Sequence, residues 1–298
     1  MIKIRFIAVA VVIIVFATYA SAQDITPGGI FEKVTDTYES LQTYRANGTI
    51  ISDVVVGGRN MRMETSFSIL LKKLNMYLIS WTQKDITLPS IIQGGAVWSD
   101  GTQPYLYIRT KNEYSKIASD EAALASATGI SGGAAFMIPS LFFSELEDQI
   151  DPFSRLKDLV VEKSEKIGKE DCYVVSGTSL ASKKETYWIS KSKYLILKCT
   201  RSLEPPEGSE MPKVTDEQLD ETLKVMGRDL TEENRKSLRS MMEMSRSIAK
   251  AKKMTGLSVE THTGISSPEL AKADFQFALP KNAVLKDTFF DSVFGGNK

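Results

Sequence analysis

The feature of this sequence that most constrains its fold is a clear alternation of apolar and polar residues between positions 61 and 71. The apolar set is Met61, Met63, Phe67, Ile69 and Leu71, and the polar set is Arg62, Glu64, Ser66 and Ser68. A period of two places successive side chains on opposite faces of a β-strand. Gly57-Gly58-Arg59-Asn60 reads as a hairpin turn, so residues 44–55 are predicted to form the antiparallel partner strand.

Strand-like segments continue through most of the chain. The two strands described above begin a first run of strands, which continues with residues 74–82, 91–99 and 105–110. A second run comprises residues 172–178, 185–190 and 194–201. Two final strands are predicted over residues 257–263 and 274–279. Residues 29–41 carry apolar side chains at spacings of three and four, which predicts a helix ahead of the first strand. The pattern indicates an α+β protein dominated by antiparallel strands.

The segment from residue 119 to residue 149 has a different character. Ser119 can cap a short helix that runs through Ala127, and Gly129-Ile130-Ser131-Gly132-Gly133 follows as a flexible link. Residues 136–143 are the most apolar stretch after the N-terminal region. A segment this apolar is unfavourable in water, so we expect it to cover an apolar face of the sheet.

Residues 203–256 interrupt the strand pattern and are predicted to be a helical insertion in a single domain of residues 23–298. Thr215 caps a predicted helix through about Val225, and Thr231 starts another that runs to about Lys253. The second helix carries a methionine-rich stripe of Leu238, Met241, Met242, Ile248 and Ala249. This stripe either packs onto the sheet or offers an adaptable apolar surface to a ligand or partner.

The first 22 residues have the layout of a cleaved secretory signal. Lys3 and Arg5 precede an apolar run from Phe6 to Phe16, and Ala20-Ser21-Ala22 supplies a cleavage site before Gln23. The alternative, an uncleaved membrane anchor, needs about 20 apolar residues, which this run does not reach. No second apolar run of that length follows, so we expect a mature protein without a membrane span, in a bacterial periplasm.

Composition and missing motifs narrow the function. The 37 basic and 37 acidic residues balance, which gives no electrostatic case for binding nucleic acid. The sequence lacks the phosphate-binding, nucleophile-elbow, C-x-x-C and H-E-x-x-H motifs. With the single histidine, His262, a histidine-rich metal site cannot form, and we expect no enzyme activity, metal or cofactor. His262 itself is predicted to be a half-exposed strand residue.

Two cysteines, Cys172 and Cys199, raise the question of a disulfide, which is the default in an oxidising compartment. The predicted three-strand meander places them on non-adjacent strands, with a third strand between. Two strand spacings of about 4.8 Å exceed the reach of a disulfide. We therefore expect two free, buried thiols.

Several short motifs, taken in order, resemble the LolA-like superfamily of periplasmic lipoprotein and lipid carriers, most closely its branch of uncharacterised predicted periplasmic proteins. These motifs are Leu41-Gln42-Thr43-Tyr44 with Gly48-Thr49, Lys72-Lys73-Leu74-Asn75-Met76, Trp98-Ser99-Asp100-Gly101-Thr102 with Tyr105-Leu106-Tyr107, Tyr187-Trp188-Ile189-Ser190-Lys191, and Phe275-Gln276-Phe277-Ala278-Leu279-Pro280. The resemblance implies a strongly curved antiparallel sheet, an open half-barrel, wrapped around helices.

The resemblance also implies a function, namely carrying or binding the acyl chains of lipids or lipoproteins in an apolar cavity, without a cofactor. The predicted cavity residues are Met61, Met63, Phe67, Ile69, Met76, Leu78, Phe136 and Phe142. Gly129 to Gly133 would be the hinge of a lid over this cavity. Two alternatives remain open: these side chains fill one another and leave no cavity, or the same fold serves a non-transporting envelope regulator or assembly factor that binds a protein partner.

Overall fold

Helices and strands account for most of the chain in the computed structural model, which describes residues 25–56, 58–86, 92–146, 151–204, 214–225, 229–236, 238–240, 242 and 255–286. The first half contains α1 (Pro27–Ser40), β1 (Thr43–Val56), β2 (Arg59–Lys72), β3 (Met76–Asp85), β4 (Ile92–Asp100), β5 (Pro104–Ile108), β6 (Glu113–Lys116), α2 (Asp120–Ile130) and α3 (Met137–Phe142). The second half contains β7 (Lys157–Ile167), β8 (Glu170–Ser179), β9 (Ser182–Ser190), β10 (Ile196–Ser202), α4 (Asp216–Val225), β11 (Thr255–Ser266), the 3₁₀-helix η1 (Lys272–Phe275) and β12 (Val284–Lys286). The predicted signal sequence, residues 1–22, lies outside the described residues.

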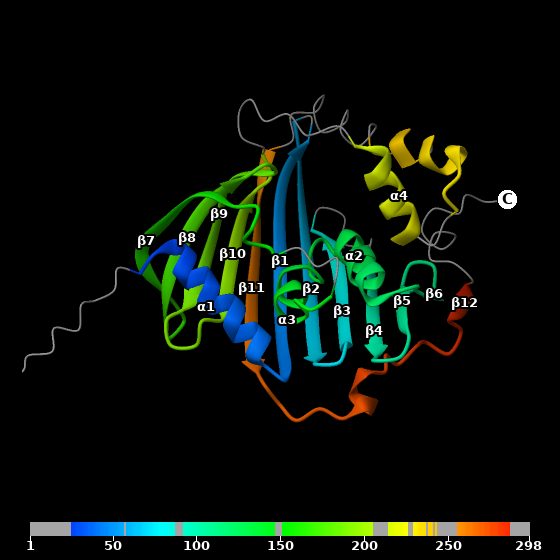
Figure 1. The fold of residues 1–298 in the computed structure, drawn as a ribbon, viewed down its shortest axis with the longest axis horizontal. Helices are drawn as coiled ribbons and strands as arrows, with labels where there is room; N and C mark the ends of the chain where they lie inside the picture. Colours follow the sequence, from blue (N-terminus) through cyan, green and yellow to red (C-terminus); the bar gives the residue numbers. More distant parts are fainter. Residues whose placement is uncertain are drawn as a thin grey trace, which may run out of the picture.

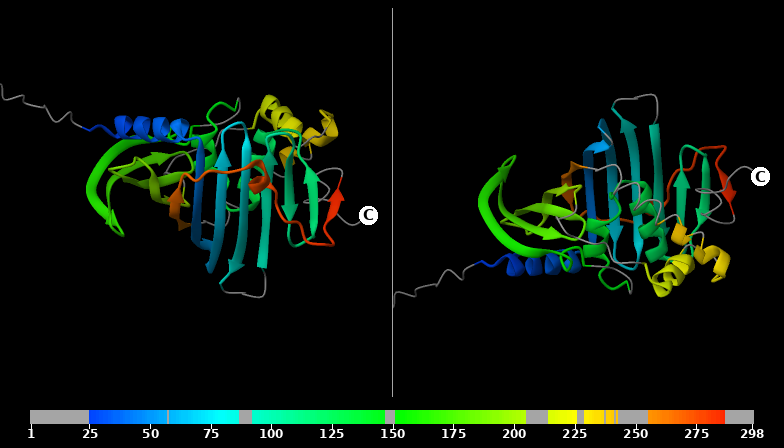
Figure 2. Two further views of the ribbon diagram at one scale, coloured as in Figure 1. Left: turned by 90° about the horizontal axis from the view of Figure 1, so that it is seen from below. Right: turned by 90° about the horizontal axis from the view of Figure 1, so that it is seen from above.

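The strands form one open sheet of twelve strands in the order β12-β6-β5-β4-β3-β2-β1-β11-β10-β9-β8-β7. Neighbouring strands are antiparallel except β12 and β6. The long pairing of β1 with β11 joins the two runs of strands, bringing Gly48 opposite His262. The sheet curls strongly, and its β7–β9 end wraps around α1 (Figure 2). The predicted α+β class and the open half-barrel are confirmed.

The main core lies between the concave face of this sheet and three helices. Helix α1 crosses strands β8 to β11, while α2 and α3 lie over the β1–β4 region (Figure 1). Helix α1 begins where Thr26 Oγ1 accepts a hydrogen bond from Gly29 N (3.1 Å) and Pro27 occupies the first turn. Its buried face is Ile30, Phe31, Val34 and Tyr38, as the spacing predicts. The helices therefore cover the concave face along most of its width.

The helical insertion separates two neighbouring strands. Ser202 at the end of β10 pairs with Leu257 in β11, so the chain between them is inserted between two paired strands. Helix α4 has a capping box, since Gln218 N donates to Thr215 Oγ1 (3.2 Å) and Thr215 N donates to Gln218 Oε1 (3.1 Å). The boundaries of the insertion, 203–256, stay a prediction because residues 205–213 and 243–254 lie outside the described residues.

Part of the methionine-rich stripe of the insertion packs internally. Leu238 is buried in a small cluster with Leu219 and Leu223 of α4, and Val214 and Met242 border it. Leu238 and Met242 therefore pack internally, but the prediction that the stripe packs onto the sheet is wrong for these two residues, because their partner is α4. Met241, Ile248 and Ala249 fall outside the side chains that the structure describes.

Two expectations about the C-terminal part of the chain are wrong. Residues 274–279 were expected as a strand, but they form the end of η1 and an irregular segment, and only Val284–Lys286 pairs with the sheet. Phe277 and Leu279 lie against the convex face of the sheet, so the segment binds through its side chains. His262 is buried, with 5% of its surface exposed, since the concave side of β11 is covered.

The cysteine prediction is confirmed. Cys172 on β8 pairs with Ser190, Cys199 on β10 pairs with Tyr187, and β9 lies between them; both thiols are free and buried. The two residues also belong to apolar clusters on opposite faces of the sheet. A disulfide would need both the spacing and the orientation to change.

Both thiols should be inert in the native protein. Burial raises the pKa of Cys172, and it raises the pKa of Cys199 to about 12, so the reactive thiolate is scarce at neutral pH. We expect no reaction with a charged aromatic disulfide reagent in native buffer, and two thiols per chain in concentrated guanidinium chloride. Failure to release two thiols on unfolding would show a disulfide and contradict the strand register.

Candidate functional site

The concave face of β2 and β3 offers a continuous apolar surface. Phe67 and Ile69 of β2 lie directly opposite Trp81 and Ile79 of β3, and all four side chains are at most 5% exposed. The alternation of β2 places these residues on one face, which confirms the predicted strand. This surface extends along the strand toward the rim, where Met63 is half-buried and Met61 is 43% exposed.

A pair of short helices, α2 and α3, covers this apolar surface. Ser119 caps α2 as predicted, accepting a hydrogen bond from Ala122 N (3.2 Å). In α3 all six residues, Met137 to Phe142, are buried, and the main core includes four of them, Met137, Ile138, Leu141 and Phe142. Gly132 and Gly133 join the helices with positive φ angles of 68° and 105°, which favour glycine. We call residues 119–143 the helical flap.

The base of the flap is held by the turn between β2 and β3. Lys73 donates its ammonium to the Phe142 carbonyl, lies 4.7 Å from the centre of the Phe142 ring and forms an ion pair with Glu145 at 3.4 Å. The N-terminal end of the flap segment is held at the same base, where Tyr77 Oη donates to Asp120 Oδ1 (2.8 Å). Burial raises the pKa of both Tyr77 and Asp120. Two polar contacts thus fasten the base, whereas the glycines lie at its tip.

The tip of the flap lies close to the sheet. A methyl group at Gly132 would come 3.2 Å from Gln83 Nε2 and 3.6 Å from Thr65 Oγ1. Thr65, Gln83 and Ser131 are buried polar residues here, and Ser131 Oγ has no hydrogen-bond partner among the described residues. The tip is therefore the less strongly bonded end of the flap.

The eight predicted cavity residues do not gather in one place. Phe67, Ile69 and Phe142 belong to the main core, and Phe136 packs against it half-buried. Met76 and Leu78 occupy the alternate positions of β3 and lie on the opposite, convex face, where Leu78 packs beside Trp98 and Tyr107. A single ligand on the concave face would contact the first group and not Met76 or Leu78.

The concave face of β9–β11 carries a buried ionic cluster that the sequence prediction missed. Glu185 Oε2 lies 3.0 Å from Arg155 Nη2 and 3.3 Å from Arg201 Nε, and Glu260 Oε2 lies 3.4 Å from Arg201 Nη1. Glu185 also accepts hydrogen bonds from Tyr187 Oη (2.8 Å) and Ser179 Oγ (2.7 Å). Both carboxylates are almost fully buried, and Arg201 lies between them.

His262 links this ionic cluster to the apolar surface. Its Nε2 lies 3.0 Å from Glu260 Oε1, although off the hydrogen-bond direction, and its ring meets the Phe67 ring edge-on at 5.6 Å. Burial opposes the charge of Glu260, but His262 and Arg201 outweigh that effect and hold the pKa of Glu260 below its ordinary value. The sequence contained an indication of this cluster. In their strands, Glu185, Arg201, Glu260 and His262 each lie two positions from a residue that is buried, so they point to the same face of the sheet as that residue.

The ionic cluster predicts how stability depends on pH. Because the folded-state pKa of Glu260 lies below the unfolded value of about 4.3, its carboxylate stabilises the fold above that pH, and this is lost as the pH falls through the folded-state pKa. We expect Glu260→Gln to destabilise the protein most near neutral pH, and the difference from wild type to shrink below about pH 4. Urea unfolding at several pH values measures it; a constant difference would contradict the assignment.

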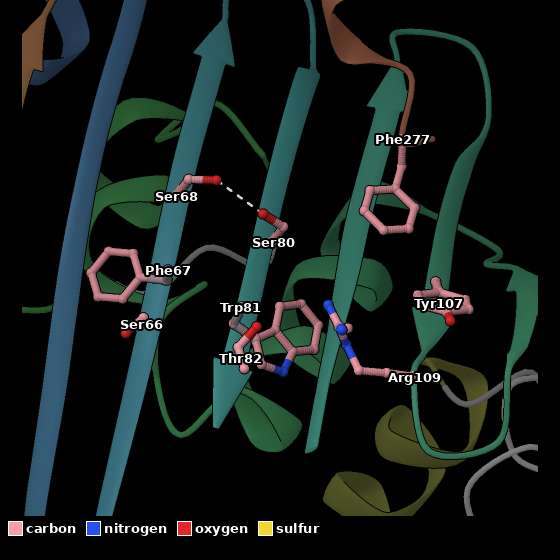
Figure 3. A pocket seen from close by; sticks show the side chains of 10 residues that line it. Ser66, Phe67, Ser68, Ser80, Trp81, Thr82, Tyr107, Arg109 and Phe277 are labelled. Atoms are coloured by element: carbon pink, nitrogen blue, oxygen red, sulfur yellow. Dashed lines mark hydrogen bonds between the residues drawn. The ribbon is translucent and has the colours of Figure 1, made fainter. Parts of the chain in front are cut away.

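The convex face of the sheet, opposite the flap and the ionic cluster, carries two cavities. One of about 250 Å³ has a floor of hydroxyl side chains on β2 and β3 and a wall that includes Tyr107, Arg109 and Phe277 (Figure 3). A larger one of about 460 Å³ lies on the other side of Phe277, between Trp98, Tyr105 and Tyr114. Among the described residues no cluster of histidine, cysteine, aspartate and glutamate could hold a metal ion.

Comparison with known proteins finds structural neighbours of low sequence identity. The sequence matches no protein-family model and no curated protein. The lipoprotein LppX of Mycobacterium tuberculosis aligns over 83% of this chain and 98% of its own, with 11% identity and a TM-score of 0.39. A LolA superfamily protein of Nitrosomonas europaea aligns over 85% and 98%, with 13% identity and a TM-score of 0.28. A chain of the MucA/MucB complex of Pseudomonas aeruginosa aligns over 85% and 61%, with 9% identity and a TM-score of 0.31.

A LolA superfamily protein is thus among the structural neighbours. At these identities and TM-scores the alignments carry no argument about activity, and the function of this chain has to be argued from its own geometry. In the part of the chain that the structure describes, none of the helices combines the length and apolarity that crossing a membrane requires.

Proposed function

We propose that this protein is a periplasmic carrier or binding protein for the acyl chains of lipids or lipoproteins, exported by a cleaved signal at residues 1–22. The observation that carries the proposal is the apolar concave face of β2 and β3 under a separate apolar flap. Acyl chains need such a surface and no cofactor, because each buried CH₂ group contributes about 0.8 kcal/mol. Phe67, Ile69, Phe136 and Phe142 are the proposed contacts, with Met61 and Met63 toward the rim.

Binding on this face requires the flap to move. Phe67, Ile69 and Phe142 are packed together in the closed structure, so an acyl chain enters only when α3 separates from the sheet. The glycines at the tip permit such a movement, while Lys73 and Tyr77 hold the base. The apparent affinity then contains the cost of opening, because only the open fraction of the protein binds.

Weakening the base should therefore strengthen binding. Lys73→Met removes the bond to the Phe142 carbonyl and the ion pair with Glu145, and opening becomes easier by about 1 kcal/mol. We expect a fluorescent fatty-acid probe to bind the variant about fivefold more tightly and to associate faster than with wild type. Stopped-flow and equilibrium fluorescence titrations measure both quantities.

The neighbouring lysine provides a matched control. Lys72 also donates to a backbone carbonyl, that of Leu270 (2.6 Å), but this carbonyl belongs to the segment after β11 and not to the flap. Lys72→Met should lose similar stability and leave probe affinity unchanged. Equal affinities for wild type, Lys73→Met and Lys72→Met would show that the flap does not control binding. No binding of the probe to any of them would remove the lipid proposal.

The second candidate function is that of an envelope regulator or assembly factor that binds a protein partner. The observation in its favour is the edge strand β7, whose outer side pairs with no strand of the described residues and whose Val160 and Val161 are exposed. An extended segment of a partner can add to such an edge through main-chain hydrogen bonds. Native mass spectrometry of protein purified from its own periplasm separates the two: bound lipid supports the carrier, and a protein partner without lipid supports the regulator.

A further inference from the structure

A second apolar cluster lies on the convex face of the sheet, away from the flap. Ala96, Trp98 and Tyr107 are buried there, and Tyr105, Tyr114 and Phe277 pack around them. The segment after η1 crosses this face, so that Phe277 lies 5.5 Å from the ring of Trp98 and 5.4 Å from that of Tyr107. Two cavities flank Phe277, which lines both of them.

The larger cavity, of about 460 Å³, has the size of a small-molecule site. Trp98 and Tyr105 stack with 5.3 Å between ring centres and 14° between ring planes, and the Tyr114 ring lies 6.4 Å from that of Tyr105. Tyr105 and Tyr114 are only half-buried. Among the described residues, no group bonds to Trp98 Nε1 or to either tyrosine hydroxyl, so these donors remain available to a ligand.

Polar side chains surround these rings. Asp100, Gln103, Lys116 and Gln276 line the same cavity, and they supply both donors and acceptors. Gln103 donates its Nε2 to the carbonyls of Pro104 and Ile117 (3.1 and 2.8 Å), which leaves its Oε1 as an acceptor. An acyl chain would leave Lys116, Gln276 and the Gln103 Oε1 acceptor unpaired. Asp100, which lies 3.4 Å from Lys272 Nζ, opposes an anion, and Lys116 opposes a cation. The chemistry that fits is a neutral ligand with many hydroxyl or amide groups.

The smaller cavity, on the other side of Phe277, is also lined by both aromatic rings and hydrogen-bonding side chains. Its floor carries the hydroxyls of Ser66, Ser68, Ser80 and Thr82, and Ser68 and Ser80 point toward each other at 2.9 Å (Figure 3). Arg109 is exposed at its wall and forms no ion pair within the described ranges. A ligand with repeating units could therefore place one unit on each side of Phe277.

We propose that this convex groove binds an oligosaccharide of N-acetylated hexosamine units. Pyranose rings present apolar C–H faces to aromatic rings, and their hydroxyls donate and accept hydrogen bonds at the rim. An N-acetyl group adds a methyl for the wall formed by Leu279 and Leu285 and an amide for Gln103 or Gln276. The site is separate from the concave face, and its occupancy is independent of the flap.

Titration calorimetry with the hexamer of β-1,4-linked N-acetylglucosamine tests the proposal on the full mature chain. We expect the hexamer to bind wild type and Tyr114→Ala to bind it about tenfold more weakly. Leu285 is 48% exposed, so Leu285→Arg should fold normally and block the groove with a bulky cation. Tyr173→Ala is the matched control: Tyr173 is a half-buried tyrosine stacked on Tyr194 outside the groove, and its loss should not change binding.

Three results would overturn the proposal. They are no binding of the hexamer to wild type, equal binding by wild type and Leu285→Arg, and displacement of the hexamer by palmitate. The last result would place a lipid in the groove. No fatty-acid binding by wild type, with hexamer binding intact, would leave the groove standing while the carrier function failed.

Discussion

Replacing Arg201 with methionine should lower the free energy of unfolding by about 3–5 kcal/mol. Arg201 is the cation between Glu185 and Glu260, whose side chains are 0% and 3% exposed. Methionine keeps the apolar volume but leaves Glu260, among the described residues, with His262 as its remaining charge-bearing neighbour at 3.0 Å. Removing one partner from a buried ion pair leaves an uncompensated charge, which costs more than the pair itself contributes. Urea unfolding at neutral pH measures the loss.

An exposed ion pair supplies the control for this change. Arg62 lies 3.5 Å from Asp53, and both side chains are at least half exposed. Arg62→Met should change stability by less than about 1 kcal/mol, because water screens such pairs. If the two substitutions cost the same, the cluster around Arg201 is not an electrostatic unit. The cluster also gives the concave face a polar half beside the apolar half under the flap.

Substituting Gly48 with alanine should cost about 2–3 kcal/mol. A methyl group there would come 2.2 Å from Phe67 Cζ and 2.5 Å from the Thr261 carbonyl oxygen. The ring of Phe67 occupies the space that Gly48 leaves free between β2 and β11, so the missing side chain positions a proposed acyl-chain contact. Because one obstacle is backbone, relaxation of the ring alone cannot relieve the overlap. Thermal and urea unfolding, together with the fatty-acid titration, measure the effect.

The same chemical change at Gly129 is the control. Gly129 lies in α2, and a methyl group there would meet no atom within 4 Å. Gly129→Ala should stabilise the protein by up to about 1 kcal/mol, since alanine favours the helix. A loss of stability at Gly129, or none at Gly48, would contradict the packing described for these two positions.

Local patterns in the sequence predicted the elements whose burial follows a simple period. The alternation in β2 and the three- and four-residue spacing in α1 identify the faces that meet the core. The meander of β8, β9 and β10 was also readable, and it correctly separated Cys172 from Cys199. In each case the pattern of apolar and polar residues is complete within about ten to fifteen residues. Over that range, the hydrophobic period alone indicates the type of element and its buried face.

Elements outside that range were missed or misread. Strand β7 is an edge strand, exposed along most of its length, so it carries charges and no alternation. Met76 and Leu78 were wrongly predicted to line the cavity because β3 is apolar on both faces. The convex face of β3 is apolar because the segment around Phe277 packs in the same cluster as Leu78. The burial of His262 depends on pairing between β1 and β11, which are more than 200 residues apart, and one sequence does not reveal that pairing.

Acyl chains are proposed to bind on the concave face of the sheet, under the helical flap. Photo-crosslinking with a diazirine-labelled fatty acid, followed by mass-spectrometric assignment of the labelled residues, tests it most directly. We expect saturable labelling at Phe67, Ile69 and Phe142 that unlabelled palmitate competes away. Labelling confined to the convex groove around Trp98 and Phe277, or labelling that does not saturate, would contradict it.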